Sequence, residues 1–455
     1  MKPQALRRLA AFVLALGAQA ACWAAGAPGV LDFSPAERAA ILSHGPWPPP
    51  LQPDRSNRLS GDARAIAFGR QLFSDPRLSG RQDRSCASCH DPGRGFTDGL
   101  PRAAGPSGEP LARNTPSVVD SRFHRWQGWS GASDSLWSAS LRPLSDASEM
   151  GPAERVVAAR VRTDAPFAQA FRHAIGRDPP KDDDQLLSDL GKALAAWQET
   201  QVSPRTQFDA FRDAVERANW TAAARYPIAA QRGLRLFVGS ARCASCHSGP
   251  LFTHGEFDQA GIAVRKRDGR TDWGRYEGVK ALRASRFNLM SAHNDDPQGS
   301  ESVRTRHAAL GLETYGSFRV PGLRGAARTA PYMHDGSLPS LRAVVEHYAG
   351  LDEVKLHIAA AHPHAEPGEP IPPRPVLSLL GGLTLGPGDI DDLVTFLETL
   401  SAPELRPSRR ARWWKRPPGD PARPSRVVKR SSRVLTALPT AERRQLRHCI
   451  PRSSP

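Results

Sequence analysis

Long apolar runs are missing from almost the whole sequence. Beyond residue 21, no stretch of the 455 residues approaches the ~20 apolar residues that a transmembrane helix needs, so we expect no stable insertion into a membrane. The one apolar run, Leu9–Ala21, is shorter and follows three basic residues, which is the order of a secretory signal peptide. We expect residues 1–24 to be such a signal and the mature protein to be periplasmic. Cys22 leaves a lipoprotein signal open.

An even spread of basic charge is also missing. The formal net charge is +16, but nearly all of the excess lies in the leader and in the residues from Ser401 onward. Nucleic-acid binding needs basic residues gathered on a folded face, so we expect no nucleic-acid partner. The tail, residues 403–455, is rich in Pro, Arg and Ser and lacks apolar periodicity, which predicts disorder.

Cysteine is scarce, and four of the six cysteines lie in two copies of Cys-Ala-Ser-Cys-His. This pentapeptide is the attachment signature of a c-type haem, in which each cysteine bonds a vinyl group and the histidine binds the iron. A redox disulfide or half of a zinc site is the alternative, but zinc ligands come as neighbouring pairs and these copies lie far apart. We therefore predict two covalently bound haems c. The predicted haem-binding residues are Cys86, Cys89, His90, Cys243, Cys246 and His247.

Each pentapeptide sits in a longer repeat. Gly69–Phe73 precedes the first copy as Gly233–Phe237 precedes the second, and Phe96–Gly99 follows the first as Phe252–Gly255 follows the second. An internal repeat of this kind predicts two related haem domains and not one domain with two motifs.

The repeat sets the expected domain organisation. We expect an N-terminal extension and linker over residues 25–60. An N-terminal cytochrome c-like domain should follow over residues 61–220, and a C-terminal one over residues 221–402.

The rest of the sequence is helical in pattern and has almost no strand signals. Ser34, followed by Pro35 and Glu37, is typical of a helix start. Apolar residues recur at helical spacing in Val156–Ile175 with a break near Pro166, in Leu186–Trp197 and in Asp389–Leu400. Val156 is expected on the inward face of the first of these. The segment Lys266–Thr314 is polar and weakly periodic and is interpreted as loop. The predicted fold class is all-α, with two cytochrome c-like haem domains and long loops.

These motifs, taken in order, resemble the bacterial dihaem cytochrome c peroxidase family, and most closely its MauG-type branch. The resemblance covers roughly Asp62–Ser401. Besides the haem signatures, it rests on Arg113–Pro116, Trp129, Ser135-Leu136, Pro143-Leu144, Glu149–Gly151, Thr329–Gly336 and Tyr348. The resemblance implies a peroxidatic N-terminal haem and a C-terminal haem that relays electrons.

The sixth ligand of each iron decides between electron transfer and chemistry. By resemblance, Tyr348 is the distal ligand of the second haem, where other peroxidases of the family carry Met; the alternative is a packed helix tyrosine. For the first haem, the segment Asp91–Pro116 contains no His or Met, which suggests an iron open to peroxide. His124 is the nearest candidate and is interpreted as a surface or core histidine.

Three further residues take catalytic roles by resemblance. Peroxide cleavage needs a base that takes a proton and returns it to the leaving oxygen. Glu149 matches that base, and Pro143 matches the residue that shapes the pocket. Trp129 matches the tryptophan between the two haems. Without the resemblance, Glu149 would be an ordinary solvated carboxylate and Trp129 an ordinary core residue.

The family also binds calcium between its domains. The side-chain amide ligand maps onto Asn114, and the backbone carbonyl ligands map onto Thr329 and Pro331. Oxygen donors of this kind suit calcium.

The sequence departs from the family at two places. The usual Trp-Asp-Gly-Arg is here Trp129–Ala132, and the distal-pocket Gln maps onto Ala139, with Trp137 nearby. The second change removes a hydrogen-bonding group that could orient peroxide.

The resemblance implies an oxidoreductase that uses hydrogen peroxide. Its electrons would come from a small redox protein, a cytochrome c or a cupredoxin, or from a protein substrate oxidised in a MauG-like reaction. A dihaem electron carrier without substrate chemistry is the main alternative, and a dioxygen-using oxygenase is another.

Overall fold

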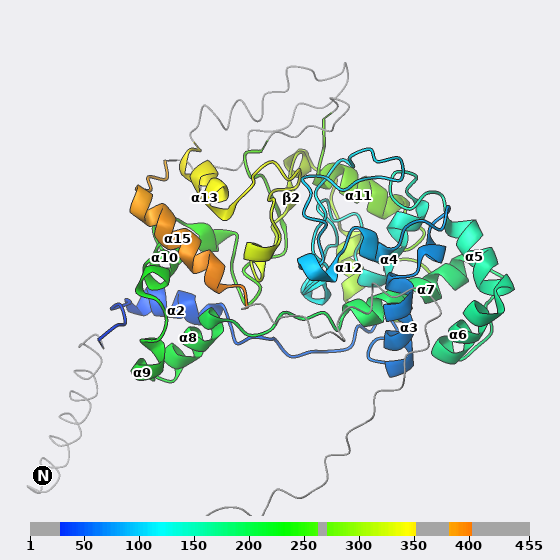
Figure 1. Ribbon diagram of the computed structural model, residues 1–455, viewed down its shortest axis with the longest axis horizontal. Coiled ribbons are helices and arrows are strands. Elements are labelled where there is room, and N and C mark those ends of the chain that lie inside the picture. The colour runs from blue at the N-terminus through cyan, green and yellow to red at the C-terminus, as the bar shows by residue number, and fades with distance from the viewer. Residues whose placement is uncertain (1–27, 263–270, 352–381, 403–455) are drawn as a thin grey trace, which may run out of the picture. The chain divides into compact units, whose positions relative to one another are not determined.

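The computed structural model describes residues 28–262, 271–351 and 382–402. The expected signal peptide, Cys22 and the basic tail lie outside the described residues. Within them the chain is mostly helical, and the one sheet pairs β1 (Phe257–Asp258) antiparallel with β2 (Phe318–Arg319) (Figure 1). Phe257 lies opposite Arg319 in this register. The expected scarcity of strands is confirmed for this part of the chain.

The helices follow one another with connections of very different length. The α-helices are α2 (Pro35–Ser43), α3 (Ala63–Phe73), α4 (Leu136–Ser145), α5 (Glu154–Thr163), α6 (Ala165–Ile175), α7 (Asp183–Gln198), α8 (Gln207–Glu216), α9 (Trp220–Ala223), α10 (Ile228–Val238), α11 (Arg275–Ala284), α12 (Glu301–Arg306), α13 (Leu341–Ala349) and α15 (Pro387–Thr399). Single 3-10 turns are η1 (Pro76–Leu78), η2 (Cys86–Ser88), η3 (Pro92–Arg94), η4 (Ser121–Phe123), η5 (Cys243–Ser245), η6 (Leu312–Thr314) and η7 (Ala326–Arg328). None of the helices in the described ranges is long and apolar enough to cross a membrane.

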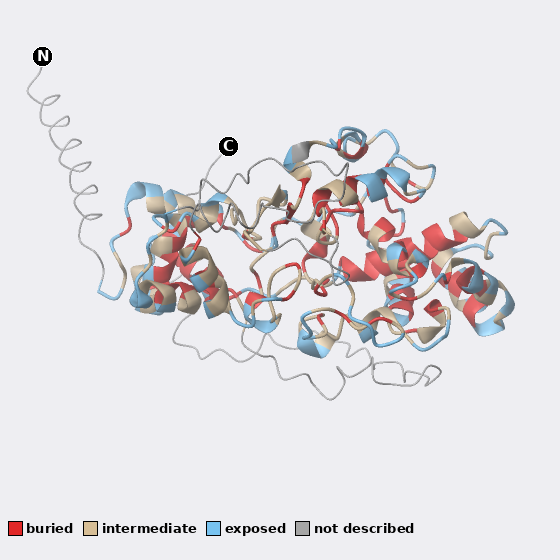
Figure 2. Ribbon diagram, turned by 90° about the horizontal axis from the view of Figure 1, so that it is seen from above, coloured by how far each residue is buried: buried red, intermediate tan, exposed pale blue. Residues whose placement is uncertain are grey.

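The buried apolar residues form two large clusters, and the buried stretches of both are coloured red in Figure 2. In the first, α7 packs against α3 and α4, while α5 and α6 pack beside them. In the second, α10 packs against α15, and α2, α8 and α13 complete the group. The N-terminal helix α2 therefore shares a core with helices that follow it by more than 160 residues.

The same glycine of the sequence repeat permits the central helix crossing in both clusters. A Cβ atom on Gly69 of α3 would overlap the backbone carbonyl of Ala193 in α7. A Cβ atom on Gly233 of α10 would overlap the backbone carbonyl of Asp392 in α15. Because backbone meets backbone at both sites, no side chain can move aside.

Several predicted helices are confirmed. The capping box at Ser34 and Glu37 forms, and the pattern Val156–Ile175 is divided at Asp164, whose side chain caps α6. Val156 itself is 40% exposed, so its expected inward position is wrong. In α15 the most deeply buried residue is Phe396, whose exposed fraction is 0%.

The interpretation of Lys266–Thr314 as loop is wrong for its described part. Helix α11 buries Val279 and Leu282 completely, and α12 follows at Glu301–Arg306. The periodicity is weak because α11 has few inward apolar residues. Its position depends instead on Gly278, which lies directly against the backbone of Ser130.

Buried polar groups hold the chain beside these helices. Lys192 on α7 is only 1% exposed and binds the carbonyl of His293 at 2.6 Å and the carboxylate of Asp295 at 2.7 Å. At the end of α7, the buried carboxyl of Glu199 accepts a hydrogen bond from the Ser60 hydroxyl. Burial raises the pKa of Glu199 to about 7.

We expect Gly233→Ala to lower the free energy of unfolding by about 3 kcal/mol or more, because the added methyl group overlaps a backbone carbonyl. Gly388→Ala is the matched control, since Gly388 lies in α15 with no atom within 4 Å of its Cβ position. That change should be neutral or stabilise by up to about 1 kcal/mol. Denaturant unfolding measures both. Equal losses in the two variants would contradict a close crossing at Gly233.

Glu199 predicts a pH dependence of stability. The folded pKa of about 7 lies above the ordinary value of 4.5, so the folded chain binds this proton more tightly than the unfolded chain does. The stability that this bound proton adds to the folded state is fully present below about pH 4.5 and is lost as pH rises through 7. At pH 8 we therefore expect Glu199→Gln to be more stable than wild type. The difference in free energy of unfolding between the two proteins should exceed the difference at pH 4.5 by at most about 3 kcal/mol. An equal difference at both pH values would contradict the raised pKa.

Candidate haem sites

The two attachment motifs adopt the same local structure. Each begins as a single 3-10 turn, η2 at Cys86 in the segment that follows α3 and η5 at Cys243 shortly after the end of α10. In both, the histidine amide donates to the carbonyl of the first cysteine at 2.9 Å, from His90 to Cys86 and from His247 to Cys243. The four cysteines are free thiols and form no disulfide. The pairs therefore remain available for thioether bonds.

Each motif histidine is oriented by a backbone carbonyl. The Nδ1 atom of His90 lies 3.1 Å from the oxygen of Phe96, and that of His247 lies 2.9 Å from the oxygen of Phe252. Burial lowers the pKa of both imidazoles, to about 4 for His247. A neutral imidazole whose Nδ1–H is engaged keeps the Nε2 lone pair for a metal.

The two carbonyl acceptors share an unusual backbone conformation. Phe96 has φ +61° and Phe252 has φ +56°, both in the left-handed region. This turn aims the carbonyl back at the imidazole, and the sequence repeat keeps phenylalanine at both positions. The backbone of Pro116 and of Pro321 offers each histidine a further acceptor.

A cavity of about 560 Å³ surrounds the second motif. Cys243, Cys246, His247 and Tyr348 all line it. Much of the remaining wall is apolar and includes Phe237, Leu251, Val345, Leu393 and Leu397. Paired thiols, a neutral imidazole and an apolar crevice are the surroundings that a covalently bound haem requires.

Tyr348 reaches this cavity from α13, more than 100 residues after the motif. Burial raises the pKa of its hydroxyl above the ordinary value, and the neighbouring groups Cys246 and Asp258 act in the same direction. In the protein alone the group is therefore a neutral phenol. The structure thus brings His247 and Tyr348 together on one cavity.

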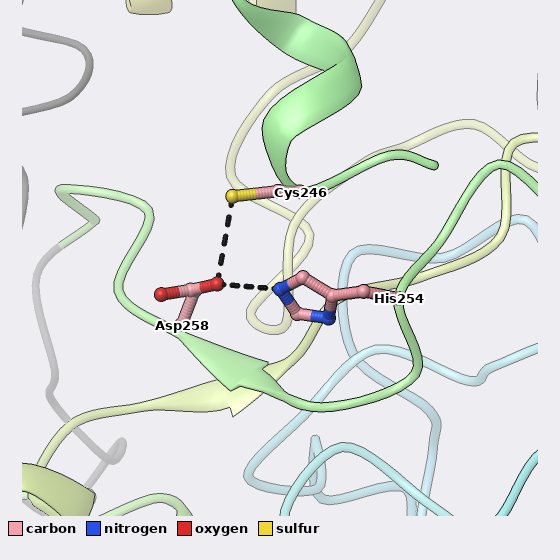
Figure 3. Close-up of side chains that lie close together, drawn as sticks. All are labelled: Cys246, His254 and Asp258. Atoms are coloured by element: carbon pink, nitrogen blue, oxygen red, sulfur yellow. Dashed lines mark hydrogen bonds and ion pairs between the residues drawn. The ribbon is translucent and has the colours of Figure 1, made fainter. Parts of the chain in front are cut away.

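A cluster of three side chains borders the second motif (Figure 3). Asp258 binds His254 at 2.9 Å and lies 3.5 Å from the sulfur of Cys246. Among the described residues this group alone has three metal-capable side chains close together. Because Cys246 belongs to the attachment motif, we assign the cluster to the edge of the haem site. The sequence carried no signal for Asp258, since the contact depends on the β1 turn.

At the first motif, Glu149 lies near both thiols. Its charge helps to raise the pKa of Cys86 to about 12 and that of Cys89 to about 11, although burial is the larger cause. Glu149 is half-buried in the turn after α4. Burial and the charge of Asp146 raise the pKa of Glu149. A raised pKa lets a carboxyl group hold a proton more readily than a free carboxyl group does, which suits a group that takes and returns protons.

Pro143 lies in the last turns of α4, just before the turn that carries Glu149. Its carbonyl accepts a hydrogen bond from the amide of Met150 at 3.2 Å, which ties the end of α4 to the Glu149 segment. Ala139 lies one turn earlier on α4. Trp137 is fully buried and donates to the Ser56 hydroxyl, so it does not replace the missing glutamine.

Trp129 connects the segments that follow the first motif to those that follow the second. Its indole nitrogen donates to the carbonyl of Asn114 at 2.9 Å. Its own carbonyl accepts from the amide of Arg319 in β2 at 2.8 Å. Trp129 also lines the cavity that holds His247.

The three candidate calcium ligands, Asn114, Thr329 and Pro331, line the same cavity wall. The amide nitrogen of Asn114 donates to the carbonyl of Leu100 at 2.9 Å, which leaves its side-chain oxygen for another partner. His124 also lines this cavity and is half-buried; burial lowers its pKa well below the ordinary value, so its imidazole is neutral.

Comparison with known proteins agrees with this geometry. The model of the di-haem cytochrome c peroxidase family matches residues 63–217. The methylamine utilization protein MauG of Methylorubrum extorquens is 31% identical over 394 residues, covering 86% of this chain and 93% of that protein. The cytochrome-c peroxidase IdrP1 of Denitromonas iodatirespirans is 31% identical over 405 residues, with the same two coverages.

The chain belongs to the di-haem cytochrome c peroxidase and MauG family. Among solved structures, a MauG-like protein associated with microbial copper homeostasis superposes with a TM-score of 0.57 at 27% identity, covering 81% of this chain and 98% of that one. The protein is accordingly a peroxidase-type or MauG-type oxidoreductase, and family membership implies two c-type haems.

Proposed function

We propose that this chain reduces hydrogen peroxide at the centre of His90 and receives electrons through the centre of His247. The observation that carries the proposal is the position of Glu149, whose carboxyl group has a raised pKa and lies beside Cys86 and Cys89. The segment between His90 and Pro116 offers no His or Met as a competing ligand. This supports an open site for peroxide at the first centre.

Glu149 would move the protons of the reaction. The carboxylate takes a proton from one peroxide oxygen and returns it to the other, so that the O–O bond breaks and the leaving oxygen departs as water. Two electrons and two protons in total convert one peroxide to two waters. Haem supplies the iron that takes up and passes on single electrons. Pro143 holds the turn that carries Glu149.

Trp129 would provide the route between the centres. Its ring lies on the cavity of His247, and its hydrogen bond to Asn114 connects it with the segment after the first motif. An aromatic ring between the two centres would divide the electron transfer into two shorter steps.

Tyr348 would be the second protein ligand of the iron that His247 binds. Both side chains line one cavity, which supports the pairing. A phenolate favours higher oxidation states than a thioether does, and this favours MauG-like oxidation of a protein partner as a second candidate function. The 31% identity with the MauG of Methylorubrum extorquens supports it as well.

The remaining parts of the proposal concern organisation and partners. The two buried clusters support two haem domains, which we propose over residues 61–220 and 221–402 with residues 25–60 as an extension. The clusters do not follow these bounds strictly, since α2 and α8 pack in the second cluster and Phe287 and Leu289 pack in the first. We also infer a calcium ion at Asn114, Thr329 and Pro331, supported by their shared cavity wall. The expected periplasmic location implies a small cytochrome c or cupredoxin as donor, or an exported protein substrate.

Glu149→Gln should reduce peroxide turnover by about 10²–10⁴-fold, because the amide can neither take nor return a proton. The measurement is the steady-state rate of the purified dihaem protein with peroxide and a reduced donor. Glu154→Gln is the matched control, since Glu154 starts α5 and pairs with Arg286 on the surface. Equal rates for wild type and Glu149→Gln would remove the proposed role. A wild type that ignores peroxide would indicate an electron carrier.

Tyr348→Phe should alter the low-spin signal of the resting diferric protein, because the second iron loses an oxygen ligand. Absorption and electron paramagnetic resonance spectra detect the change. Tyr226→Phe serves as control, because Tyr226 is buried in the second cluster but its hydroxyl binds Thr399 and does not line the cavity. An unchanged low-spin signal in Tyr348→Phe would exclude ligation by this residue.

A further inference from the structure

The two proximal loops each reach a phenylalanine with left-handed backbone, but they differ in length by one residue and in their surroundings. At the first centre, the Phe96 ring packs against Phe73 and Trp197 at centroid distances of 6.1 and 6.0 Å. The third residue after Pro116 is Val119. At the second centre, the third residue after Pro321 is an arginine, Arg324, whose side chain is 1% exposed. The repeat therefore places a buried cation at this position of the second centre and an apolar side chain at the equivalent position of the first.

Arg324 binds the loop that contains Phe252, whose carbonyl accepts the hydrogen bond from His247. Its Nε atom donates to the carbonyl of Pro250 at 2.5 Å. Its two terminal nitrogens bind the carboxylate of Asp209 at 2.8 and 3.0 Å, and Asp209 is also 1% exposed. The guanidinium further lies 3.9 Å from the ring centroid of Trp47. A planar guanidinium can serve these partners together, whereas a single ammonium cannot.

His44 covers the same loop from the end of α2. Its ring stacks on Phe252 with a centroid distance of 4.4 Å and an interplanar angle of 6°. Its Nδ1 atom lies 3.0 Å from the carbonyl of Gly249. Burial lowers the pKa of His44, which favours the neutral ring with Nδ1 as donor. Residues 249, 250 and 252 are thus each held by a group from outside the loop.

A buried ion pair is a costly way to stabilise a core, because both charges lose hydration. Arg324 and Asp209 would be replaceable by apolar side chains if packing were their whole role. Their geometry instead fixes a carbonyl two residues before the Phe252 carbonyl that His247 binds. The hydrogen bond made by the second nitrogen of a metal-bound imidazole sets the donor strength of that ligand.

We propose that Arg324 and His44 are positioning residues that hold the Phe252 carbonyl against His247 and thereby lower the reduction potential of the second haem relative to the first. The inference rests on the proposed haem at His247. A firmly held acceptor gives the imidazole more anionic character, which favours the oxidised iron. At the first centre a neutral group holds the loop, since the Ser117 hydroxyl donates to the carbonyl of Gly95 at 2.7 Å and Val119 stands in place of the arginine. Two haems with identical attachment motifs would thereby differ in potential.

The test is a spectroelectrochemical titration of the holoprotein carrying Arg324→Lys or His44→Phe. Lysine keeps a charge for Asp209 but cannot also hold Pro250. Phenylalanine keeps the stacked ring but loses the bond to Gly249. In both variants we expect the reduced-to-oxidised ratio of the second haem to rise severalfold at a fixed potential, while the ratio of the first haem stays unchanged.

Arg212→Lys is the matched control. Arg212 lies on α8 close to Asp209, its side chain is 5% exposed, and it binds Leu42 and Glu216 but not the proximal loop. The inference is overturned if Arg324→Lys and His44→Phe leave the second potential unchanged, or if Arg212→Lys shifts it equally. If Arg324→Lys fails to fold, the reduction potential of the second haem in His44→Phe tests the inference.

A haem count on each protein separates the possible failures. Two haems per chain with an unchanged second potential refutes the positioning role alone. A wild type with one haem refutes the proposed second centre before the positioning role is reached.

Discussion

Both centres depend on one hydrogen bond, from the Nδ1 atom of a motif histidine to a backbone carbonyl six or five residues later. This bond presents Nε2 to the iron, because it engages the other nitrogen and fixes the plane of the ring. It exists only because Phe96 and Phe252 adopt left-handed backbone conformations. The loops in turn need rigid support, which comes from α3 on α7 at the first centre and from α10 on α15 at the second.

From this shared constraint the two centres diverge through residues that are distant in sequence. The second centre acquires His44 from the N-terminal segment, Asp209 from α8 and Tyr348 from α13. The first acquires Glu149 from the turn after α4. A chemical difference between equivalent motifs therefore arises from tertiary packing and not from the motifs. This is how one repeat can serve two functions, peroxide chemistry and electron relay.

The local features of the fold were predictable, and the long-range ones were not. Ser34 and Glu37 make their capping box within four residues, so the sequence shows it directly. The repeated Gly69 and Gly233 were visible as a pattern, but their role appears only when the carbonyls of Ala193 and Asp392 are in place. Asp258 reaches Cys246 through a turn for which periodicity has no signal.

The missed helix α11 and the departure at Trp129–Ala132 have a common physical basis. Arg275 on α11 donates to the carbonyl of Gly131 at 2.7 Å and lies 4.1 Å from the ring centroids of both Trp126 and Phe257. Its burial is deep enough to lower its pKa to about 10. Arg275 of α11 therefore places a buried guanidinium against the segment Trp129–Ala132, where Ala132 itself carries no charge.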